Sequence, residues 1–466
     1  MTLIKSISGI RGTIGGKVGD NLTPVDAVKF ASAYGTFLKA GSGKLEDGRK
    51  LKVVIGRDAR ISGPMIHNLV QNTLLGLGID VIDLGLSTTP TVEVAVPMEN
   101  ADGGIILTAS HNPKQWNALK LLNAKGEFLS GAEGAKILEI ADAEAFDFVD
   151  VDALGEVTVN DSYMDIHIDE VLELPLVDAD LVKTKKYKVV VDGVNSTGGI
   201  IIPNLLEQMG VEVVKLYCEP NGHFPHNPEP LKEHLGDICK LVIEEKADFG
   251  IVVDPDVDRL AFISNDGEMF GEEYTLVAVA DYVLSKTPGN TVSNMSSSRA
   301  LRDITEKHKG SYQASAVGEV NVVELMKKTN AIIGGEGNGG IIYPELHYGR
   351  DSLVGVALFL TYLAGQDKTV AEIRASYPQY YMSKNKIELT PQIDVDAILE
   401  SLTTTYKNEQ ISTIDGVKID FATEWVHLRK SNTEPIIRIY TEAPTQQDAD
   451  VLAERFVNEL KVIAGI

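Results

Sequence analysis

The stretch Ile105-Ile106-Leu107-Thr108-Ala109-Ser110-His111-Asn112-Pro113 decides the fold of the first part of the chain, because it joins an apolar strand to a tight turn. The apolar run Ile105–Leu107 follows Gly103-Gly104, and Asn112-Pro113 stops any continuation as a helix. Ser110 is therefore expected on a tight exposed loop at the mouth of a strand. A hydroxyl in this position is able to meet a substrate, although Ser-His-Asn-Pro also occurs in ordinary turns.

Strand-like and helix-like segments alternate around this stretch, over about the first 370 residues. The pattern predicts strands over residues 51–56, 81–84, 105–107, 188–193, 211–216, 249–253, 290–293 and 331–333. It predicts helices from Thr23 to Gly41 and over 65–77, 91–98, 200–209, 231–244, 273–284 and 352–363. Alternation at this spacing indicates βαβ units with a mostly parallel sheet between layers of helices.

The chain of 466 residues is too long for a single hydrophobic core. A polar, acidic stretch over 142–174 interrupts the alternation and is expected to join two domains. From about Lys386 the pattern changes, because helices over 395–405 and 447–463 enclose strands over 417–419 and 436–440. The sequence therefore predicts an α/β protein with three α/β blocks, followed by a smaller α+β unit with an antiparallel sheet.

Composition excludes several classes of protein. The formal net charge of −24 argues against binding to nucleic acid or to an anionic membrane surface. No apolar run approaches the roughly 18 residues of a membrane span, and the first residues lack the apolar segment of a signal peptide. The two cysteines, Cys218 and Cys239, have no metal-ligand spacing and indicate a reducing compartment. We expect a soluble cytoplasmic protein.

Three carboxylates alternate in Asp254-Pro255-Asp256-Val257-Asp258-Arg259, directly after the strand over 249–253. Such carboxylates repel one another unless a cation neutralises them, so the loop predicts a metal site. An EF-hand does not fit, because Arg259 and Asn265 stand where that loop needs Gly and Glu. Magnesium is favoured, since three protein oxygens leave positions for water and a phosphoryl oxygen. Arg259 is a candidate to hold a phosphoryl oxygen during transfer.

The glycine-rich run over 334–340 exposes only two side chains, Glu336 and Asn338. Its glycines allow the backbone to approach a ligand closely, and a carboxylate with an amide two residues away is able to bind neighbouring sugar hydroxyls. A flexible loop is the alternative interpretation.

A basic and hydroxyl-rich cluster follows in the last part of the chain. It is able to cradle a phosphate, and a helix-capping turn is the alternative interpretation. Its candidate residues are Arg429, Ser431, Asn432, Thr433 and Arg438. Near the N-terminus, Arg11 lies among glycines and is read as functional, whereas Arg57 and Asp58 are read as a structural pair.

Together these motifs resemble the α-D-phosphohexomutase superfamily, which includes phosphoglucomutases, phosphomannomutases and phosphoglucosamine mutases. The resemblance spans nearly the whole chain and rests on five motifs in the family's order. They are Gly9–Gly12, Thr108–Pro113, Asp254–Arg259, Gly335–Gly339 and Arg429–Pro435.

The resemblance implies four domains around a central cleft, three of them related mixed-sheet α/β domains and the last an α+β domain. We expect a phosphoserine loop in 1–165, a metal loop in 166–270, a sugar-binding loop in 271–384 and a phosphate-binding loop in 385–466. It further implies a small-molecule sugar phosphate as the partner, with no nucleic acid and no membrane, in a monomer or homodimer.

The resemblance also implies a mechanism. Ser110 would carry a phosphoryl group and pass it to the sugar, and the bisphosphorylated sugar would turn around and return its other phosphate to the serine. Ser110, Asp254, Asp256 and Asp258 would hold one Mg²⁺, and a sugar bisphosphate would act as activator. The catalytic residues implied are Ser110, Lys120 as candidate general base, Arg11, His111 and Arg259. Glu336 and Asn338 would read the sugar, and the cluster from Arg429 to Arg438 would grip the other phosphate.

The chain departs from the family pattern at several positions. Asn338 and Gly340 stand where many bacterial members have serine and histidine, so a histidine often credited with acid/base work is absent. Asn432 stands where glycine is usual, and Glu319 occupies a position where other residues are common. We expect these changes to tune the choice of sugar rather than to abolish phosphoryl transfer.

Three classes of function remain open at this stage. The first is a phosphohexose mutase, for which the overall resemblance favours conversion of glucosamine 6-phosphate to glucosamine 1-phosphate, with glucose or mannose phosphates as the alternative. The second is a phosphatase that uses the same phosphoserine. The third is an inactive sugar-phosphate-binding protein, against which the presence of Ser110, Lys120 and the three aspartates argues.

Replacing Ser110 by alanine tests the implied mechanism. We expect Ser110→Ala to abolish turnover of hexose phosphates while the protein still folds, because only the acceptor hydroxyl is removed. Turnover is measured by the rate of sugar 1-phosphate formation, and folding by circular dichroism. Wild-type turnover in the folded variant would show that this serine does not carry the phosphoryl group.

Overall fold

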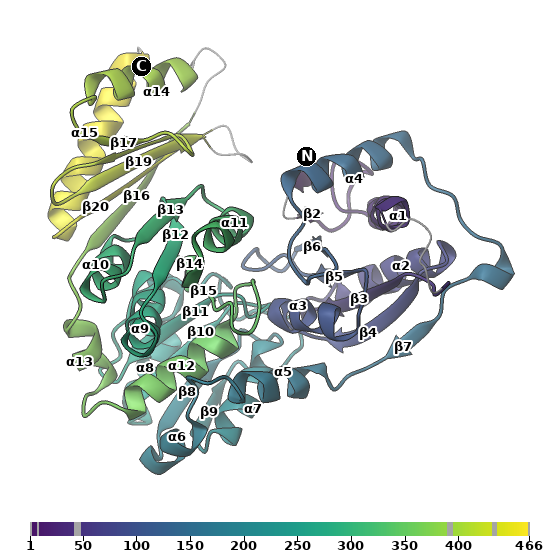
Figure 1. The fold of residues 1–466 in the computed structure, drawn as a ribbon, viewed down its shortest axis with the longest axis horizontal. Helices are drawn as coiled ribbons and strands as arrows, with labels where there is room; N and C mark the ends of the chain where they lie inside the picture. The colour runs from purple at the N-terminus through teal and green to yellow at the C-terminus, as the bar shows by residue number, and fades with distance from the viewer. Residues whose placement is uncertain (1, 7–8, 42–47, 389–394, 431–435, 465–466) are drawn as a thin grey trace. The chain divides into compact units, whose positions relative to one another are not determined.

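The computed structural model of the protein describes residues 2–6, 9–41, 48–388, 395–430 and 436–464 (Figure 1). Contacts along the backbone divide the chain into two compact units. Unit 1 comprises Met1–Thr275 and Asn338–Ala371, and unit 2 comprises Leu276–Gly337 and Glu372–Ile466. Among the described residues, no helix combines the length and the apolar character that crossing a membrane requires.

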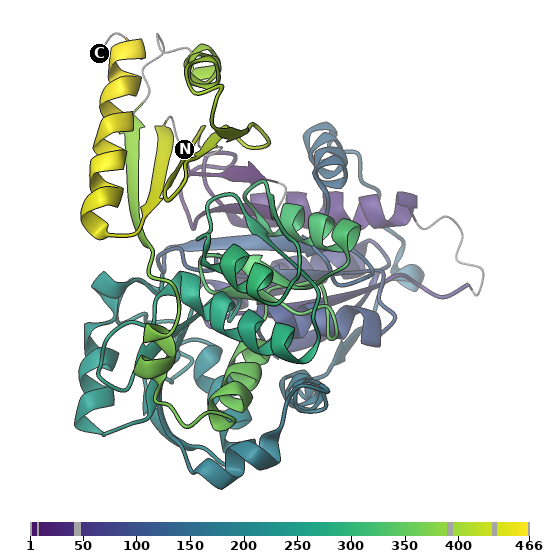
Figure 2. The same ribbon diagram turned by 60° about the vertical axis from the view of Figure 1, so that its left-hand side comes forward.

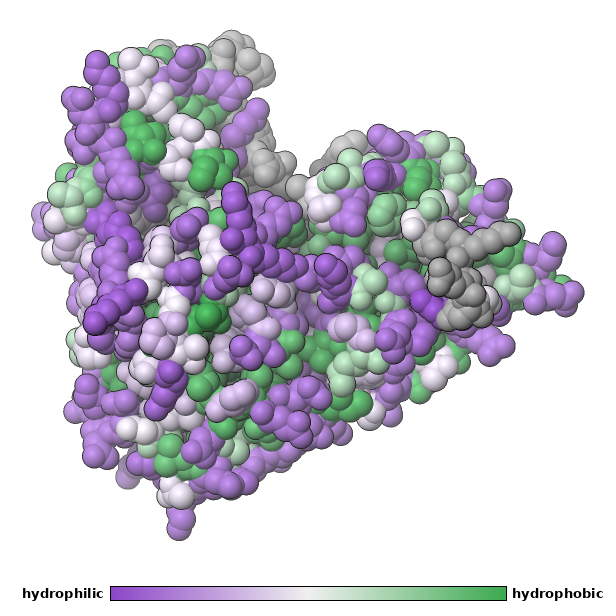
Figure 3. Space-filling view, in the orientation of Figure 1, coloured by the Kyte–Doolittle hydropathy of each residue, from purple (hydrophilic) through white to green (hydrophobic). Residues whose placement is uncertain are grey.

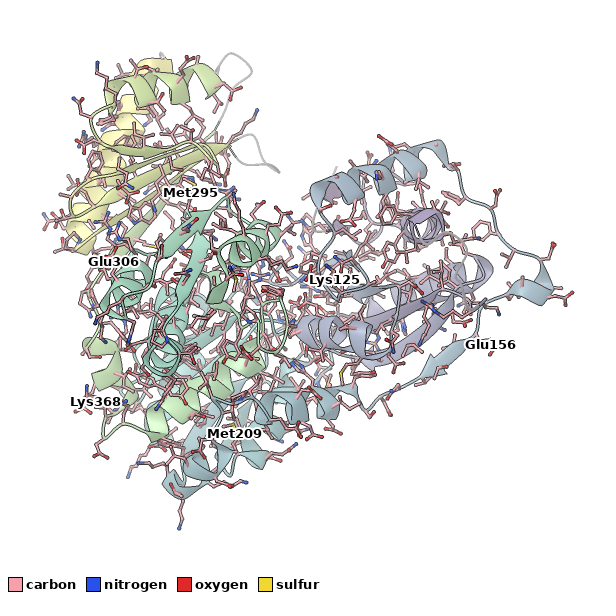
Figure 4. The ribbon with its side chains drawn as sticks, viewed as in Figure 1. Lys125, Glu156, Met209, Met295, Glu306 and Lys368 are labelled. Atoms are coloured by element: carbon pink, nitrogen blue, oxygen red, sulfur yellow. The ribbon has the colours of Figure 1, made fainter. Side chains whose placement is uncertain are left out.

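The first sheet of unit 1 has seven strands in the order β1-β2-β6-β5-β3-β4-β7. The strands from β1 to β5 in this order pair antiparallel, and those from β5 to β7 pair parallel, so the sheet is mixed. Figure 4 labels Glu156, which leads into the edge strand β7. The strands are β1 (Ile4–Ser6), β2 (Gly9–Thr13), β3 (Lys52–Arg57), β4 (Asp80–Leu86), β5 (Gly103–Leu107), β6 (Trp116–Leu122) and β7 (Val157–Val159).

Helices cover both faces of this sheet (Figure 1). The alternation of side chains along β3 places Val53 and Ile55 in one hydrophobic core and Val54 in another. The first core is closed by α1 (Pro24–Gly41), α2 (Gly63–Gly76) and α4 (Gly131–Ala143). The second is closed by α3 (Thr89–Met98) and α5 (Tyr163–Leu172). A short 3₁₀ turn, η1 (Val151–Ala153), precedes β7.

The second sheet of unit 1 has the order β11-β10-β8-β9, with β11 antiparallel to the rest. Its strands are β8 (Lys188–Asp192), β9 (Glu212–Leu216), β10 (Phe249–Val253) and β11 (Leu260–Ser264). The nearby helices are α6 (Ala179–Lys185), α7 (Gly198–Gln208), η2 (Lys232–His234) and α8 (Gly236–Glu244). β10 is buried along its whole length and ends at the predicted metal loop.

Helix α12 (Ser352–Ala364) packs in unit 1, although the sequence pattern assigns it to the third block. The Phe359 ring stacks on Phe262 with centroids 4.1 Å apart, and it meets Phe249 and Phe270 edge-on. The helix is apolar all round and almost entirely buried, which suits a helix enclosed by protein. The short strand β15 (Gly340–Ile342) precedes it in unit 1.

Unit 2 begins with three strands paired parallel in the order β13-β12-β14. They are β12 (Asn290–Asn294), β13 (Tyr312–Ser315) and β14 (Ala331–Glu336). The accompanying helices are α9 (Glu272–Lys286), α10 (Ala300–Lys307), α11 (Glu319–Thr329) and α13 (Val370–Ala375). Met295, which is labelled in Figure 4, directly follows β12.

The last sheet of unit 2 is antiparallel throughout, in the order β16-β20-β19-β18-β17. Its strands are β16 (Tyr381–Glu388), β17 (Gln410–Ser412), β18 (Val417–Asp420), β19 (Trp425–Lys430) and β20 (Ile436–Ala443). The helices α14 (Val395–Thr405) and α15 (Gln446–Ala464) contribute Leu402 and Phe456 to its core. Figure 2 shows α15 lying along β16 and β20.

The architecture confirms the predicted fold class, with three α/β parts followed by a part whose sheet is antiparallel. The four domain limits stay a prediction. The region expected to be only a linker, 142–174, contains β7 and α5, and the sequence pattern did not predict β2, β6, β11 or β19. On the face shown in Figure 3, hydrophobic residues lie in small groups among hydrophilic ones.

Replacing Phe359 by alanine tests the packing of α12. We expect Phe359→Ala to lower the free energy of unfolding by about 3–5 kcal/mol, because it empties a fully enclosed ring site. Urea unfolding measures the change. The matched control is Phe148→Ala, which removes a ring that is 54% exposed and should cost less than about 1 kcal/mol. Equal effects of the two substitutions would contradict this role of Phe359.

Candidate functional site

Ser110 lies on the turn that follows β5, as predicted, but its side chain is buried. Its backbone has a φ of +47°, in the left-handed region that non-glycine residues rarely adopt. The Thr108 hydroxyl helps to hold this conformation, because Thr108 Oγ1 accepts from Ser110 N at 3.0 Å and donates to Asp58 Oδ2 at 2.7 Å. Such strained residues gather at functional sites, where the surrounding contacts must fix them.

Arg60 holds the serine loop from inside and was not identified from the sequence. Its guanidinium is fully buried and donates to the carbonyl oxygens of Ser110, Asn112, Pro113 and Trp116. Its Nε also donates to Asp58 Oδ2 at 2.9 Å.

Arg57 and Asp58, which were predicted to be a structural pair, are in contact, but not through their two charged groups. Arg57 reaches only the backbone carbonyl of Asp58, and the Asp58 carboxylate pairs with Arg60. Arg60, two residues after Asp58, turns back and donates to its carboxylate. The carbonyl oxygens of the loop around Ser110 hold Arg60 in this position.

The aspartate loop begins where β10 ends, and its three carboxylates are fully buried. Val257, between the second and third aspartates, has a φ of +65°, which is a true outlier for a β-branched residue. The backbone N–H groups of Asp258 and Arg259 donate to Asp254 Oδ1 at 3.2 and 3.1 Å. This tight turn brings one oxygen of each aspartate within 4.8 Å of the others.

Both oxygens of Asp254 accept hydrogen bonds from protein donors, whereas Asp256 and Asp258 each have one oxygen without such a donor. Asp254 Oδ2 accepts from the Ser110 hydroxyl at 2.8 Å. Asp256 Oδ1 and Asp258 Oδ1 are buried and have no hydrogen-bond partner among the described residues. Burial, together with the negative charges of Asp258 and Asp256, raises the pKa of Asp254 well above its usual value. Three hard oxygen donors in this state fit a divalent cation such as Mg²⁺.

Lys120, on β6, supplies the nearest positive charge to two of these carboxylates. Its ammonium donates to Asp256 Oδ2 at 2.6 Å and to Asp258 Oδ2 at 3.2 Å. Burial alone would lower the pKa of Lys120, but the Asp256 and Asp258 carboxylates outweigh it and hold the pKa above its usual value. The side chain is therefore a cation in this arrangement and does not lie ready as a base.

Positive charges gather around Ser110. His111 Nδ1 lies 3.3 Å from Ser110 Oγ. Burial is the main reason that the pKa of His111 lies well below its usual value. The positive charges of Arg259, Arg11 and Arg350 lower this pKa further, and the negative charge of Asp258 raises it in part. The buried Arg11 Nε has no hydrogen-bond partner among the described residues, whereas Arg259 Nη1 donates to Glu229 Oε1 at 3.2 Å. Unpaired buried donors and converging cations form a site suited to an anion.

Arg350 is a second residue that sequence reasoning missed. Its Nη2 donates to Asp258 Oδ2 at 2.8 Å. A Cβ atom at position 340 would lie 2.3 Å from Arg350 Cδ, so the absence of a side chain at Gly340 leaves the space that Arg350 occupies. A histidine at position 340, as in the family pattern, would therefore collide with Arg350 in its present position. Gly340 is the feature of the sequence that could have indicated a neighbouring side chain at this point.

The two side chains of the glycine-rich run differ from the expectation that both project freely. Glu336 is buried, and its Oε1 accepts from Asn294 Nδ2 at 2.9 Å and from Gly318 N at 3.2 Å. Asn338 Oδ1 accepts from Gly340 N at 3.2 Å, which forms a tight turn. Gly339, at a φ of +84°, lies against the Leu260 carbonyl and leaves no room for a side chain.

Arg429 on β19 and Arg438 on β20 lie directly opposite each other in the antiparallel ladder. Like charges in this position repel, so the pair favours an anion between them. The Arg429 Nε is buried and has no hydrogen-bond partner among the described residues, while Arg438 Nη1 donates to the Tyr440 hydroxyl at 3.4 Å. The other predicted residues of this cluster, Ser431, Asn432 and Thr433, lie outside the described residues.

The structure thus groups the predicted site residues into two sets. Unit 1 contains the serine loop, the aspartate loop and their cations, together with Asn338. Unit 2 contains Glu336, Arg429 and Arg438.

Family profiles match four successive segments of the chain. Three are the α/β/α domains I, II and III of phosphoglucomutase/phosphomannomutase, over residues 3–148, 165–267 and 271–381. The fourth is the C-terminal domain of phosphoglucomutase/phosphomannomutase, over residues 380–459.

Relatives resemble the chain over nearly its full length. A Thermococcus kodakarensis protein named phosphoglucomutase/phosphomannomutase is 36% identical over 445 residues, which cover 94% of this chain and 95% of the relative. A Methanopyrus kandleri protein named probable phosphoglucosamine mutase is 32% identical and covers 97% and 96%. A crystal structure of a phosphoglucomutase/phosphomannomutase family protein from Burkholderia thailandensis shares the fold, with a TM-score of 0.84, 24% identity and coverage of 99% and 98%.

Replacing Arg60 by lysine tests how the serine loop is held. We expect Arg60→Lys to lower the free energy of unfolding by about 2 kcal/mol or more, since lysine cannot reach four carbonyl oxygens at once. Amide hydrogen exchange of residues 109–117 should become faster. The control, Arg57→Lys, loses only one contact to a carbonyl and should leave exchange there unchanged. Unchanged exchange in Arg60→Lys would refute the role given to Arg60.

Proposed function

The chain belongs to the phosphoglucomutase/phosphomannomutase family of the α-D-phosphohexomutase superfamily, and we propose that it interconverts 6-phospho and 1-phospho sugars through a phosphoserine at Ser110. It is then an isomerase that acts by phosphoryl transfer. The observation that carries the proposal is the position of the Ser110 hydroxyl, which donates to Asp254 Oδ2 at 2.8 Å. Buried oxygens of Asp256 and Asp258 in the same loop have no hydrogen-bond partner among the described residues, and three arginines lower the pKa of the adjacent His111.

Phosphoryl transfer depends mainly on position and on charge neutralisation, and the residues around Ser110 can supply both. In the first half-reaction, the bond between Ser110 Oγ and phosphorus breaks as a sugar hydroxyl oxygen bonds to that phosphorus. The sugar hydroxyl proton goes to a base, Ser110 Oγ takes up a proton as it leaves the phosphorus, and the product is a sugar bisphosphate. In the second half-reaction, Ser110 Oγ loses its proton and bonds to the other phosphorus, while the bond between that phosphorus and its sugar oxygen breaks. The sugar oxygen takes up a proton, and the isomerised monophosphate leaves.

The residues of unit 1 have separate tasks in this proposal. Asp254, Asp256 and Asp258 would hold Mg²⁺, with a phosphoserine oxygen as a further ligand, and the ion would neutralise charge on the transferring phosphoryl group. Arg11 and Arg259 bind phosphoryl oxygens. His111, kept neutral by its surroundings, is able to hydrogen-bond with the serine oxygen.

Lys120 is proposed as the proton carrier, and this role has a condition. Its ammonium is bound to Asp256 and Asp258 in the structure and can donate a proton to a leaving oxygen. The Asp256 and Asp258 carboxylates hold its pKa above its usual value, so Lys120 would accept a proton only where other positive charge neutralises them. A divalent cation held by the three aspartates would supply such charge.

Recognition of the sugar and of its second phosphate is assigned to the remaining residues. We propose that Glu336 and Asn338 bind sugar hydroxyls, and that Arg429, Ser431, Asn432, Thr433 and Arg438 grip the phosphate that is not transferred. The Arg429–Arg438 pair supports the second assignment, because an anion between two facing guanidinium groups removes their repulsion.

Glucosamine 6-phosphate is the proposed substrate. This choice is supported by relatives named probable phosphoglucosamine mutase from Methanopyrus kandleri and Pyrococcus horikoshii, which are 32% and 33% identical to this chain. The Thermococcus kodakarensis relative named phosphoglucomutase/phosphomannomutase supports glucose or mannose phosphates as the alternative. We further propose one Mg²⁺ per chain, a sugar bisphosphate as activator, a cytoplasmic location, and a monomer or homodimer.

A phosphorus NMR time course tests the proposal. The protein is incubated with Mg²⁺, a catalytic amount of sugar bisphosphate, and the 6-phosphate of glucosamine, glucose or mannose in parallel. We expect a 1-phosphate signal that grows fastest from glucosamine 6-phosphate.

The same spectra distinguish the alternatives. Faster growth from glucose or mannose 6-phosphate would contradict the choice of sugar while leaving the mutase. Release of inorganic phosphate without any 1-phosphate would instead show a phosphatase, and no change in any sample would contradict the proposed mutase. Ser110→Ala is the control for a contaminating mutase.

A further inference from the structure

A second group of potential metal ligands lies in unit 1, apart from the aspartate loop. It consists of His167 on α5, His347 on the loop before α12, and Asp351, which caps the start of α12. Three atoms of these side chains lie within 4.8 Å of one another. His167 Nε2 is 2.9 Å from Asp351 Oδ2, and His347 Nε2 is 3.2 Å from the same oxygen. The side chains of His167, His347 and Asp351 are 0%, 10% and 1% exposed.

The far nitrogen of each imidazole lies close to a side-chain oxygen of α3. His167 Nδ1 hydrogen-bonds with Thr91 Oγ1 at 3.0 Å, whereas His347 Nδ1 lies 3.4 Å from Glu93 Oε2 and has no hydrogen-bond partner among the described residues. An Nδ1–H of His167 that donates to Thr91 leaves its Nε2 with a lone pair on the side of Asp351 Oδ2. A hydroxyl or carboxylate behind the ring is an outer support that metal-binding histidines commonly have, and the Glu93 carboxyl group lies in that place behind His347.

The backbone around the cluster is built for this close approach. Asp351 Oδ1 accepts from Leu353 N and Val354 N, so Oδ2 is the oxygen that faces the histidines. Gly349 passes so close to Glu93 that a Cβ atom there would lie 1.9 Å from Glu93 Oε2. The glycine therefore allows the loop to bring His347 against Glu93.

We propose that His167, His347 and Asp351 bind one divalent transition-metal ion, of which Zn²⁺ is the best fit. Two imidazole nitrogens and one carboxylate oxygen suit Zn²⁺ or Co²⁺, whereas Mg²⁺ prefers an all-oxygen set such as the aspartate loop. The three protein ligands leave a fourth position for water. The Asp351 carboxylate contributes negative charge to a bound divalent ion, and the Glu93 carboxyl group lies beside His347.

The position of the cluster gives the ion a structural task. Its ligands and their supports come from α3, from α5 and from the segment that enters α12, which are far apart in the sequence. The segment next to Asp351 also touches the aspartate loop, because Arg350 donates to Asp258 and Ser352 N donates to Val257 O at 3.2 Å. From α3, Thr89 donates to Asp256. A bound ion would thus hold together α3 and the segment that enters α12, both of which contact the aspartate loop.

Cobalt spectroscopy tests this site on the full-length protein. After chelation and removal of the chelator, Co²⁺ is titrated in the presence of excess Mg²⁺, which occupies the all-oxygen site. We expect one equivalent of Co²⁺ to bind with the intense visible bands of four-coordinate cobalt, and Zn²⁺ but not Mg²⁺ to remove them. Zn²⁺ should also raise the melting temperature by mass action.

Two variants and one control locate the bound ion. His347→Gln should abolish the bands, and Glu93→Gln should weaken cobalt binding by about 10–100-fold, as loss of a ligand's support does. The control, His226→Gln, changes a histidine that also pairs with an aspartate, 3.0 Å away, and should bind cobalt like the wild type.

The proposal is overturned if the wild type shows no intense bands under excess Mg²⁺, or if folded His347→Gln retains them. If His347→Gln does not fold, crystals of the wild type grown with Zn²⁺ decide. Anomalous scattering at the zinc edge then gives a peak between the three side chains, or its absence refutes the site. A histidine and carboxylate cluster without metal would give neither the bands nor the peak.

Discussion

The mutual repulsion of three buried carboxylates is the constraint on which the site depends. Asp254, Asp256 and Asp258 share one short loop without any exposed surface, and the chain compensates from several directions. Lys120 and Arg350 supply charge, and backbone N–H groups bind Asp254 Oδ1. These contacts hold one oxygen of each of Asp256 and Asp258 and leave the other without a partner, which is a state that a divalent cation completes.

Contacts with neighbouring residues also position Ser110. The unusual backbone at Ser110 and at Val257 has to be fixed by neighbours, and Arg60 and Thr108 fix the first of these. The Ser110 hydroxyl then meets Asp254, which joins the loop that follows β5 to the loop that follows β10. Both loops extend from the carboxyl ends of strands in two different sheets, where ligands of open α/β sheets usually bind.

Sequence reasoning found what is encoded locally. The serine loop, the alternating aspartates and the glycine run each lie within a few residues, so their chemistry is visible without the fold. Arg60 and Arg350 were missed, because what they do depends on where distant carbonyls and carboxylates lie. Strand β19 was missed because Arg429, near its end, was interpreted as the start of a phosphate-binding loop. The expectation that the Glu336 side chain projects freely was wrong for the same reason, since its partners Asn294 and Gly318 are remote in sequence.

The mass of the intact protein, measured before and after incubation with a sugar bisphosphate and Mg²⁺, tests the central claim most directly. The account predicts a gain of one phosphoryl group, located on Ser110 by peptide fragmentation and lost again when a sugar monophosphate is added. Ser110→Ala should gain nothing. A protein that turns over hexose phosphates while Ser110 stays unmodified, or that takes the phosphoryl group on another residue, would contradict the account.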